Sequence, residues 1–287
     1  MKKKIILTVS FLAVFGLIFS WVVAGLLLAP NQKKVVIPII DIPVLDFTLQ
    51  SESGSLLAGW HIKSDKNKGV IVLLHGIRAS RLDMLKRAKM LYAEGYSSVL
   101  IDLQAHGESS GENITIGYLE KFDAVAAIKF AKEQHPNEPV GLIGVSLGGA
   151  SAVLASPINV DAIILESVFP DLVTAVHNRV EIRLGFLSWL PAELLLAQIK
   201  PRLGFDVSEV RPIDKISDIK PPVFIISGKE DLHTTEKGTR ELFSKANNPK
   251  ALWLVEGAAH VDMFNKTPEE YREKVVEFFN ENMGDQF

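Results

Sequence analysis

Short apolar runs rich in β-branched residues recur along the chain, as expected for strands buried on both faces of a parallel sheet. They cover residues 70–74, 98–101, 140–144, 162–165, 223–226 and 252–255. Helical periodicity lies between them, at 82–93, 119–133, 235–246 and 268–283. Two earlier runs, 45–49 and 56–62, flank Ser53-Gly54 and predict a hairpin. The pattern predicts an α/β fold with a mostly parallel, doubly wound sheet and an N-terminal antiparallel hairpin.

One segment departs from this alternation. Residues 169–220, between the strand that ends near Glu166 and the strand that starts at Val223, show helical periodicity and many apolar side chains. A simple crossover needs far less chain, so we expect a small helical cap insertion at about 170–215. Its apolar side chains, including Trp189 and Leu190, either line an acyl pocket or only pack within a helical subdomain.

The N-terminus carries a different pattern. Residues 5–29 contain no charge, follow three lysines and end before Pro30. A helix over this run is about 37 Å long, and a hydrocarbon core is about 30 Å thick. A single transmembrane signal anchor is therefore favoured over a signal peptide cleaved near Val22-Val23-Ala24, whose apolar region would be shorter, and over a buried core helix. The expected division is a membrane anchor or signal segment at 1–34 and a catalytic domain at 35–287. That domain is expected outside the cytoplasm, or secreted if the segment is cleaved.

Composition narrows the classes of function. The chain has no cysteine, which excludes a disulfide scaffold, a zinc-thiolate site and a cysteine nucleophile. Residues 1–34 hold five lysines and no acid, so the other 253 residues hold 26 basic and 34 acidic residues, a net charge of −8. Such a domain is a poor nucleic-acid binder, because neutralisation of phosphates dominates that affinity.

The strongest chemical feature is Gly144-Val145-Ser146-Leu147-Gly148, which follows an apolar strand and opens a helical pattern. This is the setting of a nucleophile elbow, in which a sharp turn exposes the serine and leaves no room for side chains at the flanking glycines. The alternative is an ordinary glycine-rich helix start or a phosphate-binding turn. The segment has neither G-x-G-x-x-G nor a Walker lysine, so the nucleophile is the better interpretation.

A serine nucleophile needs a base that is oriented by an acid. Among the histidines after Ser146, His260 follows the last predicted strand and is the candidate base. His177 lies in the insertion, and His233 is expected to be a loop or substrate-side histidine. Asp231, directly after the strand at 223–226, is the candidate acid. Glu230 is adjacent but expected to point elsewhere, and Glu166, after the preceding strand, is the alternative acid. The order Ser146, Asp231, His260 is the one expected for this fold.

The chain resembles the α/β-hydrolase superfamily from about residue 45 to its end. Leu73-Leu74-His75-Gly76-Ile77 is similar to the His-Gly turn of that family, which implies an oxyanion hole made by the backbone N–H groups of Ile77 and Leu147. Residues 102–109 (DLQAHGES) resemble its D-x-x-x-x-G-x-S loop, a supporting element. Arg78, Ser80 and Arg81, together with the segment 114–118, resemble bacterial hydrolases grouped with serine aminopeptidases.

These features predict a serine hydrolase that cleaves carboxylic ester or thioester bonds of a small or lipid-like acyl substrate through an acyl-enzyme. No cofactor is expected. A metal held by Asp102 and His106 is disfavoured, because no further ligands have fitting spacing. The alternatives are a serine peptidase or aminopeptidase, with Glu181 or Glu193 holding the substrate amine, and a non-catalytic hydrolase-fold membrane scaffold.

Overall fold

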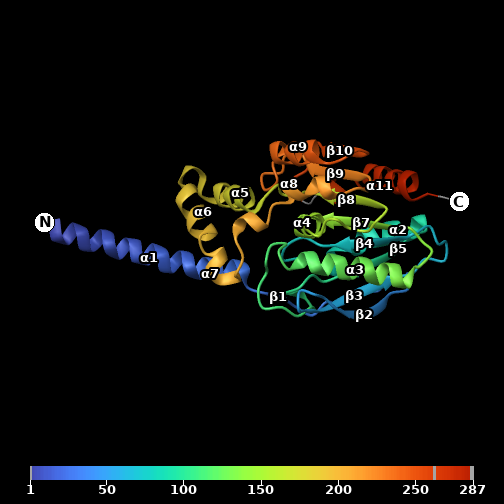
Figure 1. Cartoon of the computed structure of the whole chain (residues 1–287), viewed down its shortest axis with the longest axis horizontal. Coiled ribbons are helices and arrows are strands. Elements are labelled where there is room, and N and C mark those ends of the chain that lie inside the picture. The colour runs from blue at the N-terminus through green and yellow to red at the C-terminus, as the bar shows by residue number, and fades with distance from the viewer. Residues whose placement is uncertain (1, 261–262, 285–287) are drawn as a thin grey trace.

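A central sheet between two layers of helices dominates the computed structural model, which describes residues 2–260 and 263–284 (Figure 1). Among the described residues, the central sheet has eight strands in the spatial order β10-β9-β8-β7-β4-β5-β3-β2. Their bounds are β2 (Leu45–Gln50), β3 (Leu56–Ile62), β4 (Val70–Leu74), β5 (Ser97–Ile101), β7 (Val140–Val145), β8 (Ala162–Glu166), β9 (Val223–Gly228) and β10 (Lys250–Val255).

The pairing of the strands confirms the predicted α/β fold. β2 and β3 form the antiparallel hairpin, in which Leu45 pairs with His61, and β3 is also antiparallel to β5. All other neighbours in the sheet, from β5 to β10, run parallel. The carboxyl ends of the parallel strands therefore lie at one edge of the sheet, where their following loops can bring side chains together.

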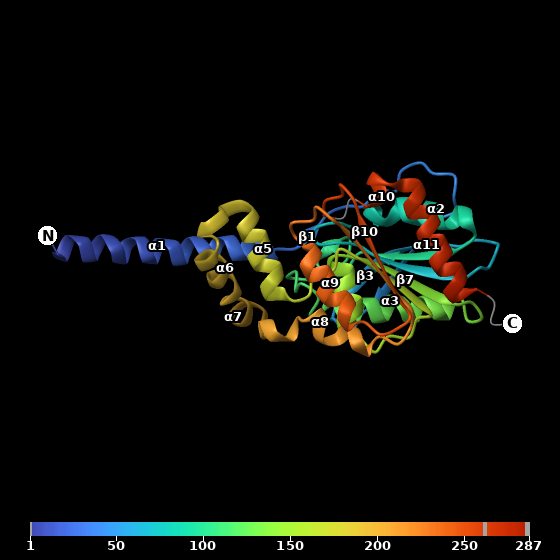
Figure 2. The same ribbon diagram turned by 90° about the horizontal axis from the view of Figure 1, so that it is seen from above.

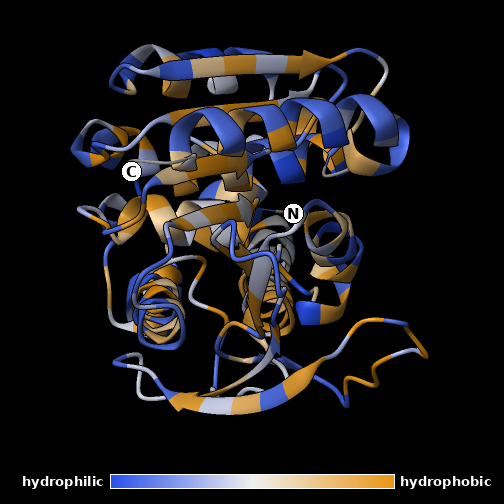
Figure 3. Cartoon of the chain, turned by 90° about the vertical axis from the view of Figure 1, so that its right-hand side faces the viewer, coloured by the Kyte–Doolittle hydropathy of each residue, from blue (hydrophilic) through white to orange (hydrophobic). Residues whose placement is uncertain are grey.

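Helices cover both faces of the sheet (Figure 2). One layer contains α3 (Glu120–Gln134), α4 (Leu147–Leu154) and α9 (Glu236–Lys245), and the other contains α2 (Leu85–Glu94), the short α10 (Met263–Lys266) and α11 (Pro268–Met283). Along β4, Val70, Val72 and Leu74 belong to the first core, whereas Ile71 and Leu73 belong to the second. This alternation of side chains explains why the strand is apolar throughout. Figure 3 shows apolar strands between helices that carry polar outer faces.

The expected insertion consists of short helices beside one end of the domain, and those before residue 204 lie near α1 in both ribbon views (Figures 1 and 2). They are α5 (Leu172–Leu184), α6 (Trp189–Leu196), α7 (Ile199–Leu203) and α8 (Pro212–Lys215), with 3₁₀ turns at Gly185–Leu187, Val207–Glu209 and Ile216–Asp218. Ala192, Leu196 and Ile199 are buried. Trp189 is 66% exposed and Leu190 58% exposed, so these two side chains do not line an enclosed acyl pocket.

The N-terminal segment forms helix α1 (Lys2–Leu28), which extends away from the domain (Figure 1). Within the described part of the chain, no helix was found with the length and apolar character needed to cross a membrane. The expectation of a transmembrane helix is therefore not supported. Near its C-terminal end α1 instead contacts the protein: Gln198 donates a hydrogen bond to Ser20 Oγ at 2.8 Å, and Ala24 and Leu28 are buried.

The chain that follows α1 also lies against the domain, which the sequence did not indicate. The short strand β1 (Asn31–Gln32) pairs in parallel with β6 (His106–Gly107). Asn31 donates to the carbonyl of Arg78 at 2.6 Å, and Arg78 donates to the carbonyls of Leu26 and Leu27. Because the last carbonyls of a helix lack partners within it, an arginine at this place stabilises the helix end. Residues 26–32 are thereby connected to the turn that contains Ile77.

Candidate active site

Ser146 lies at the turn between β7 and α4, as predicted from the G-x-S-x-G segment. Its backbone has φ of 48° and ψ of −107°, a conformation that is uncommon for a residue with a side chain. The strand fixes one side of this turn, since Ser146 N–H donates to the carbonyl of Glu166 at 2.7 Å. The helix fixes the other side, since Ala150 N–H donates to the carbonyl of Ser146 at 2.9 Å. The turn thus holds the serine at the carboxyl edge of the sheet.

The two flanking glycines are required by close backbone approach. A Cβ at Gly144 would lie 2.5 Å from the Cα of Gly149, and a Cβ at Gly148 would lie 2.4 Å from the carbonyl oxygen of Leu74. Both distances are shorter than any normal Cβ contact. Glycine is therefore the residue that permits β7, α4 and β4 to meet at this turn.

A hydrogen-bonded chain joins Ser146 to His260 and Asp231. His260 Nε2 lies 3.2 Å from Ser146 Oγ, and His260 Nδ1 lies 2.7 Å from Asp231 Oδ2. A carboxylate accepts hydrogen bonds and does not donate them, so Nδ1 carries the proton and Nε2 is free to accept the proton of the serine hydroxyl. The structure brings together the three residues that the sequence singled out, from the loops that follow β7, β9 and β10.

Asp231 is held in an ionised, oriented state. The residue is buried, and its Oδ1 accepts the N–H groups of His233 and Thr234, both at 2.8 Å. Burial by itself would raise the pKa of Asp231, but the hydrogen bond from His260, the charge of His260 and the backbone hydrogen bond from Thr234 together hold that pKa below its ordinary value. The carboxylate can therefore orient the imidazole ring and stabilise it when it becomes protonated.

The predicted oxyanion amides are both available. Within residues 2–260 and 263–284, neither the Ile77 nor the Leu147 N–H donates to a protein acceptor. Leu147 is the first residue of α4, where helix geometry leaves the N–H without an internal partner and where the helix dipole favours negative charge. Gly148 N–H donates to the carbonyl of His75 at 3.0 Å, which ties this helix start to the turn that carries Ile77.

His75 supports that turn and does not take part in proton transfer. Its Nε2 accepts the N–H of Leu103 at 3.0 Å, so its Nδ1 carries the proton and donates to the carbonyl of Gly76 at 2.7 Å. Burial, together with the charge of His106, lowers the pKa of His75 to about 3, which keeps the ring neutral. A buried neutral histidine thus fixes the backbone just before Ile77.

Asp102 and His106, the pair considered for a metal, have other partners. Asp102 is fully buried, forms an ion pair with Arg81 and accepts the N–H of Glu108 at 2.8 Å. His106 Nδ1 lies 2.9 Å from the carbonyl of Gln104. Among the residues that the structure describes, no group of three or more potential ligands converges on a metal position. Asp102 and its loop therefore support the fold beside the turn at Ile77.

The alternative acid, Glu166, and the histidine of the insertion, His177, also have partners away from Ser146. Glu166 is buried and accepts hydrogen bonds from Arg87, at 2.9 and 2.5 Å, and from Tyr271. His177 Nε2 lies 2.9 Å from Glu193, so this glutamate, which was a candidate for holding a substrate amine, already has a partner in the insertion. Glu181, the other candidate for that role, is exposed on α5.

Residues of α5 lie near the triad, which the sequence did not indicate. The His233 ring lies 5.0 Å from the His260 ring, between centroids, and Asn178 of α5 donates to the His233 carbonyl at 3.1 Å. Arg179 follows Asn178 and is half-buried. His233 was expected in a loop or on the substrate side, but nothing in the local sequence connects α5 to the loop after β9, because that contact is made by folding.

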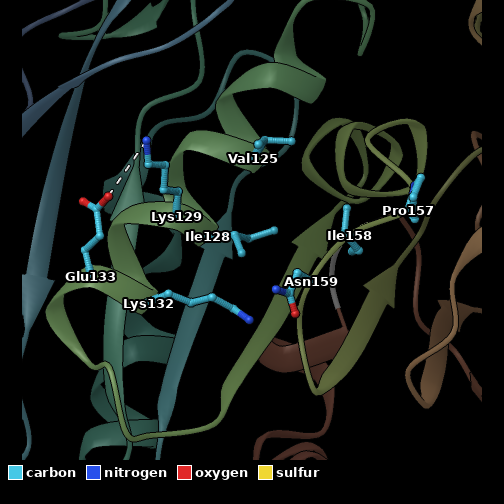
Figure 4. Close-up of a pocket in the computed structure, with 8 residues that line it drawn as sticks. All are labelled: Val125, Ile128, Lys129, Lys132, Glu133, Pro157, Ile158 and Asn159. Carbon is cyan, nitrogen blue, oxygen red and sulfur yellow. Dashed lines mark ion pairs between the residues drawn. The ribbon is translucent and has the colours of Figure 1, made fainter.

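One surface hollow lies away from the triad. A cavity of about 410 Å³ lies between α3 and the loop 157–159 and contains none of the three triad residues (Figure 4). Figure 4 also shows Lys129 and Glu133 of α3 among the residues that line this cavity. Lys129 Nζ lies 4.0 Å from Glu133 Oε1. The loop precedes β8, so this hollow lies at the amino edge of the sheet, opposite the edge that carries Ser146.

The fold agrees with comparisons to known proteins. The model of a family described as serine aminopeptidase, S33, matches residues 65–203. The crystal structure of an esterase from Pyrococcus furiosus is similar with a TM-score of 0.72 and 26% identity, over 88% of this chain and 100% of that one. The chain belongs to the α/β-hydrolase superfamily.

Relatives of this α/β-hydrolase occur in distant organisms. An α/β-hydrolase domain-containing protein of Arabidopsis thaliana is 28% identical over 90% of both chains. An uncharacterized protein of Bacillus subtilis is 29% identical over 83% of this chain and 80% of its own length. The similarity to both covers most of the chain, so the superfamily assignment applies to the whole domain and not to the nucleophile segment alone.

Proposed function

We propose that this α/β-hydrolase cleaves carboxylic ester or thioester bonds through a covalent acyl-enzyme formed on Ser146. The observation that carries the proposal is the hydrogen-bonded chain from Ser146 Oγ through His260 to Asp231. Beside it are two backbone N–H groups that have no protein acceptor among the described residues. A nucleophile, a base oriented by an acid, and donors for an oxyanion are the parts that acyl transfer requires.

The first half-reaction would form the acyl-enzyme. Ser146 Oγ attacks the carbonyl carbon of the substrate while His260 Nε2 takes the hydroxyl proton. The charge that develops on the carbonyl oxygen is stabilised by the N–H groups of Ile77 and Leu147. One such donor typically lowers the activation free energy by about 3 kcal/mol. The tetrahedral intermediate then expels the alcohol or thiol, which receives the proton from His260.

The second half-reaction would regenerate the enzyme. A water molecule gives a proton to His260 Nε2 and attacks the acyl carbon, through a second tetrahedral intermediate held by the same two amides. Its collapse releases the carboxylic acid and returns the proton to Ser146 Oγ. Asp231 accepts the hydrogen bond from Nδ1 throughout and stabilises each transient imidazolium. No step in this sequence requires a cofactor.

A peptidase activity is the second candidate, favoured by the description of the family model that matches residues 65–203. An aminopeptidase would need a carboxylate near Ser146 to hold the free amine of its substrate. Glu193 is paired with His177, and Glu181 is exposed, so neither candidate from the sequence supports that role. The environment of the triad therefore favours an ester over an aminoacyl substrate.

Labelling with a fluorophosphonate tests the proposal directly. The wild-type protein should be labelled, Ser146→Ala should not, and Ser151→Ala, which removes another serine hydroxyl from α4, should be labelled as the wild type is. Hydrolysis of p-nitrophenyl esters and of aminoacyl p-nitroanilides then separates the two candidates. Folded wild-type protein that neither reacts with the probe nor hydrolyses any ester would contradict the proposal and favour a non-catalytic scaffold.

The location of the protein outside the cytoplasm stays a prediction, because it depends on how residues 1–34 are handled in the cell. Fractionation of cells, followed by protease treatment of intact spheroplasts, would test it. Degradation of the domain from outside is the expected result, whereas protection of the domain from the protease would contradict the prediction.

A further inference from the structure

Helix α5 of the insertion lies against the loop that carries the catalytic acid. Asn178 donates to the carbonyl of His233 at 3.1 Å, and the His233 ring lies 5.0 Å from the His260 ring. His233 N–H in turn donates to Asp231. The middle of α5 is therefore only a few contacts away from the reacting groups of the proposed mechanism.

Arg179, the next residue of α5, directs its guanidinium back along the helix. Its Nη1 donates to the carbonyl of Ala175 at 3.0 Å, and Ala175 is 3% exposed. Side chains on a helix lean toward its N-terminus, which here is the buried end that emerges near β8. The charged group thus lies between the insertion and the carboxyl edge of the sheet, and not in open solvent.

Among the residues that the structure describes, the half-buried Arg179 has no acidic partner, unlike the buried Arg81 and Arg87. Arg81 pairs with Asp102 and Glu108, and Arg87 pairs with Glu166. Within residues 2–260 and 263–284, no carboxylate lies within ion-pair distance of Arg179 or of Arg183, an exposed residue one turn further along α5. Because removing a cation from water is costly unless an anion accompanies it, a substrate anion would be favoured beside the partly buried Arg179.

The electrostatics of the surrounding groups agree with this placement. Burial lowers the pKa of Arg179, and the charge of Asp231 opposes that effect. Burial also lowers the pKa of His233, as do the charges of His260, Arg179 and Arg183. Asp231 cannot serve as the missing partner, because its oxygens already accept N–H groups from His260, His233 and Thr234.

We propose that Arg179, assisted by Arg183, binds an anionic group of the substrate and so directs the enzyme to acyl compounds that carry a carboxylate or a phosphate near the scissile carbonyl. The planar guanidinium presents paired donors that match either anion. This inference rests on the proposed ester hydrolysis and deepens it. It also explains the choice of ester over aminoacyl substrate, because the same two cations would repel a free amine.

Paired substrates test the inference. The p-nitrophenyl monoester of adipic acid carries a free carboxylate, its methyl ester is neutral and of nearly the same length, and an ω-phosphono analogue presents a phosphonate. After subtraction of spontaneous hydrolysis, kcat/KM of the wild type should favour an anionic ester over the neutral one by about tenfold or more. The relative rates of the two anionic esters identify the preferred anion.

Three variants assign this preference to the residue. Arg179→Met should abolish the preference, Arg179→Lys should keep part of it, and Arg240→Met, which removes an exposed arginine of α9, should keep all of it. Competitive inhibition of the wild type by adipate, which should weaken as salt is added, gives an independent measurement that needs no variant.

Each outcome has a distinct meaning. The inference would be overturned if the wild type hydrolysed anionic and neutral esters with nearly equal kcat/KM. It would also be overturned if Arg179→Met lost the hydrolysis of anionic and neutral esters to the same extent, because Arg179 would then only position Asp231 or the helix. Absence of both ester hydrolysis and fluorophosphonate labelling in folded wild-type protein would overturn the proposed function, and the inference with it.

Discussion

Replacing Asp231 by asparagine should nearly abolish hydrolysis although it changes few atoms. Oδ1 of Asp231 accepts two backbone N–H groups at 2.8 Å, so an asparagine must place its carbonyl oxygen at that position. The amide NH₂ then occupies the position of Oδ2, 2.7 Å from His260 Nδ1, and offers a donor where the carboxylate offered an acceptor. The two backbone amides therefore decide which way the asparagine points.

The consequence is the wrong tautomer of His260. Facing a donor, Nδ1 must become the acceptor, so the ring proton moves to Nε2. Nε2, 3.2 Å from Ser146 Oγ, can then no longer accept the serine proton. A change of this kind in a serine protease triad lowers kcat about 10⁴-fold, which corresponds to about 5.5 kcal/mol of activation free energy, and we expect a loss of similar size here.

The assay is the steady-state hydrolysis of a p-nitrophenyl ester, with thermal unfolding followed by circular dichroism to confirm that each variant is folded. Asp231→Ala, which leaves both tautomers possible, should lose no more activity than Asp231→Asn. Glu230→Gln, a change of the exposed neighbouring acid, should keep wild-type activity. Activity of folded Asp231→Asn within tenfold of the wild type would refute the tautomer argument and the role of Asp231.

Three other predictions concern groups around the site. Glu166→Gln should lower the free energy of unfolding by about 3–5 kcal/mol, because it leaves the buried Arg87 without its anion. Urea unfolding measures this change, and a loss below about 0.5 kcal/mol would show that the ion pair is unimportant for stability. Burial raises the pKa of Asp123 to about 7, so the native state retains a proton that the unfolded chain loses above about pH 4. The stability of the wild type should therefore contain a component that falls between about pH 4 and pH 7, by at most about 1.4 kcal/mol per pH unit, and that is absent in Asp123→Asn; parallel urea-unfolding curves across this range would contradict it. Deletion of residues 2–34 removes β1 and the end of α1 that Arg78 contacts, so it should lower kcat more than deletion of residues 2–19 does. Equal kcat values for the two truncated proteins would show that these contacts do not support the turn at Ile77.

Much of the fold was predictable because its signals are local. A strand buried on both faces must be apolar at every position, which makes such strands visible in the sequence. The strands predicted at 56–62 and 70–74 coincide with β3 and β4, and the others differ at their ends only. The helix predicted at 82–93 begins instead as a 3₁₀ turn at Arg81–Met84, since helix ends depend on hydrogen bonds that periodicity does not specify.

The N-terminal segment shows the limit of such patterns. Hydropathy alone suggested that residues 5–29 cross a membrane, but hydropathy does not record what a helix contacts. Ser20, Ala24 and Leu28 of this segment face the protein, and Arg78 binds the carbonyls at its end. Those contacts join residues far apart in the sequence, and no local pattern encodes them.

Some features of the candidate site were likewise readable in the sequence, and others became visible only in the folded structure. The sequence by itself determined the glycine-flanked turn of Ser146 and the positions of Asp231 and His260 after strands, because parallel strands deliver their following loops to one edge of the sheet. The tertiary structure alone decided that Glu166 pairs with Arg87 and that Asp231 meets His260 at 2.7 Å. It alone also placed α5, which carries Arg179, against the loop that contains Asp231, with no acidic partner for Arg179 among the described residues. The physical reason is that an ion pair, or its absence, depends on separations of a few ångströms between distant segments, which only the packed core fixes.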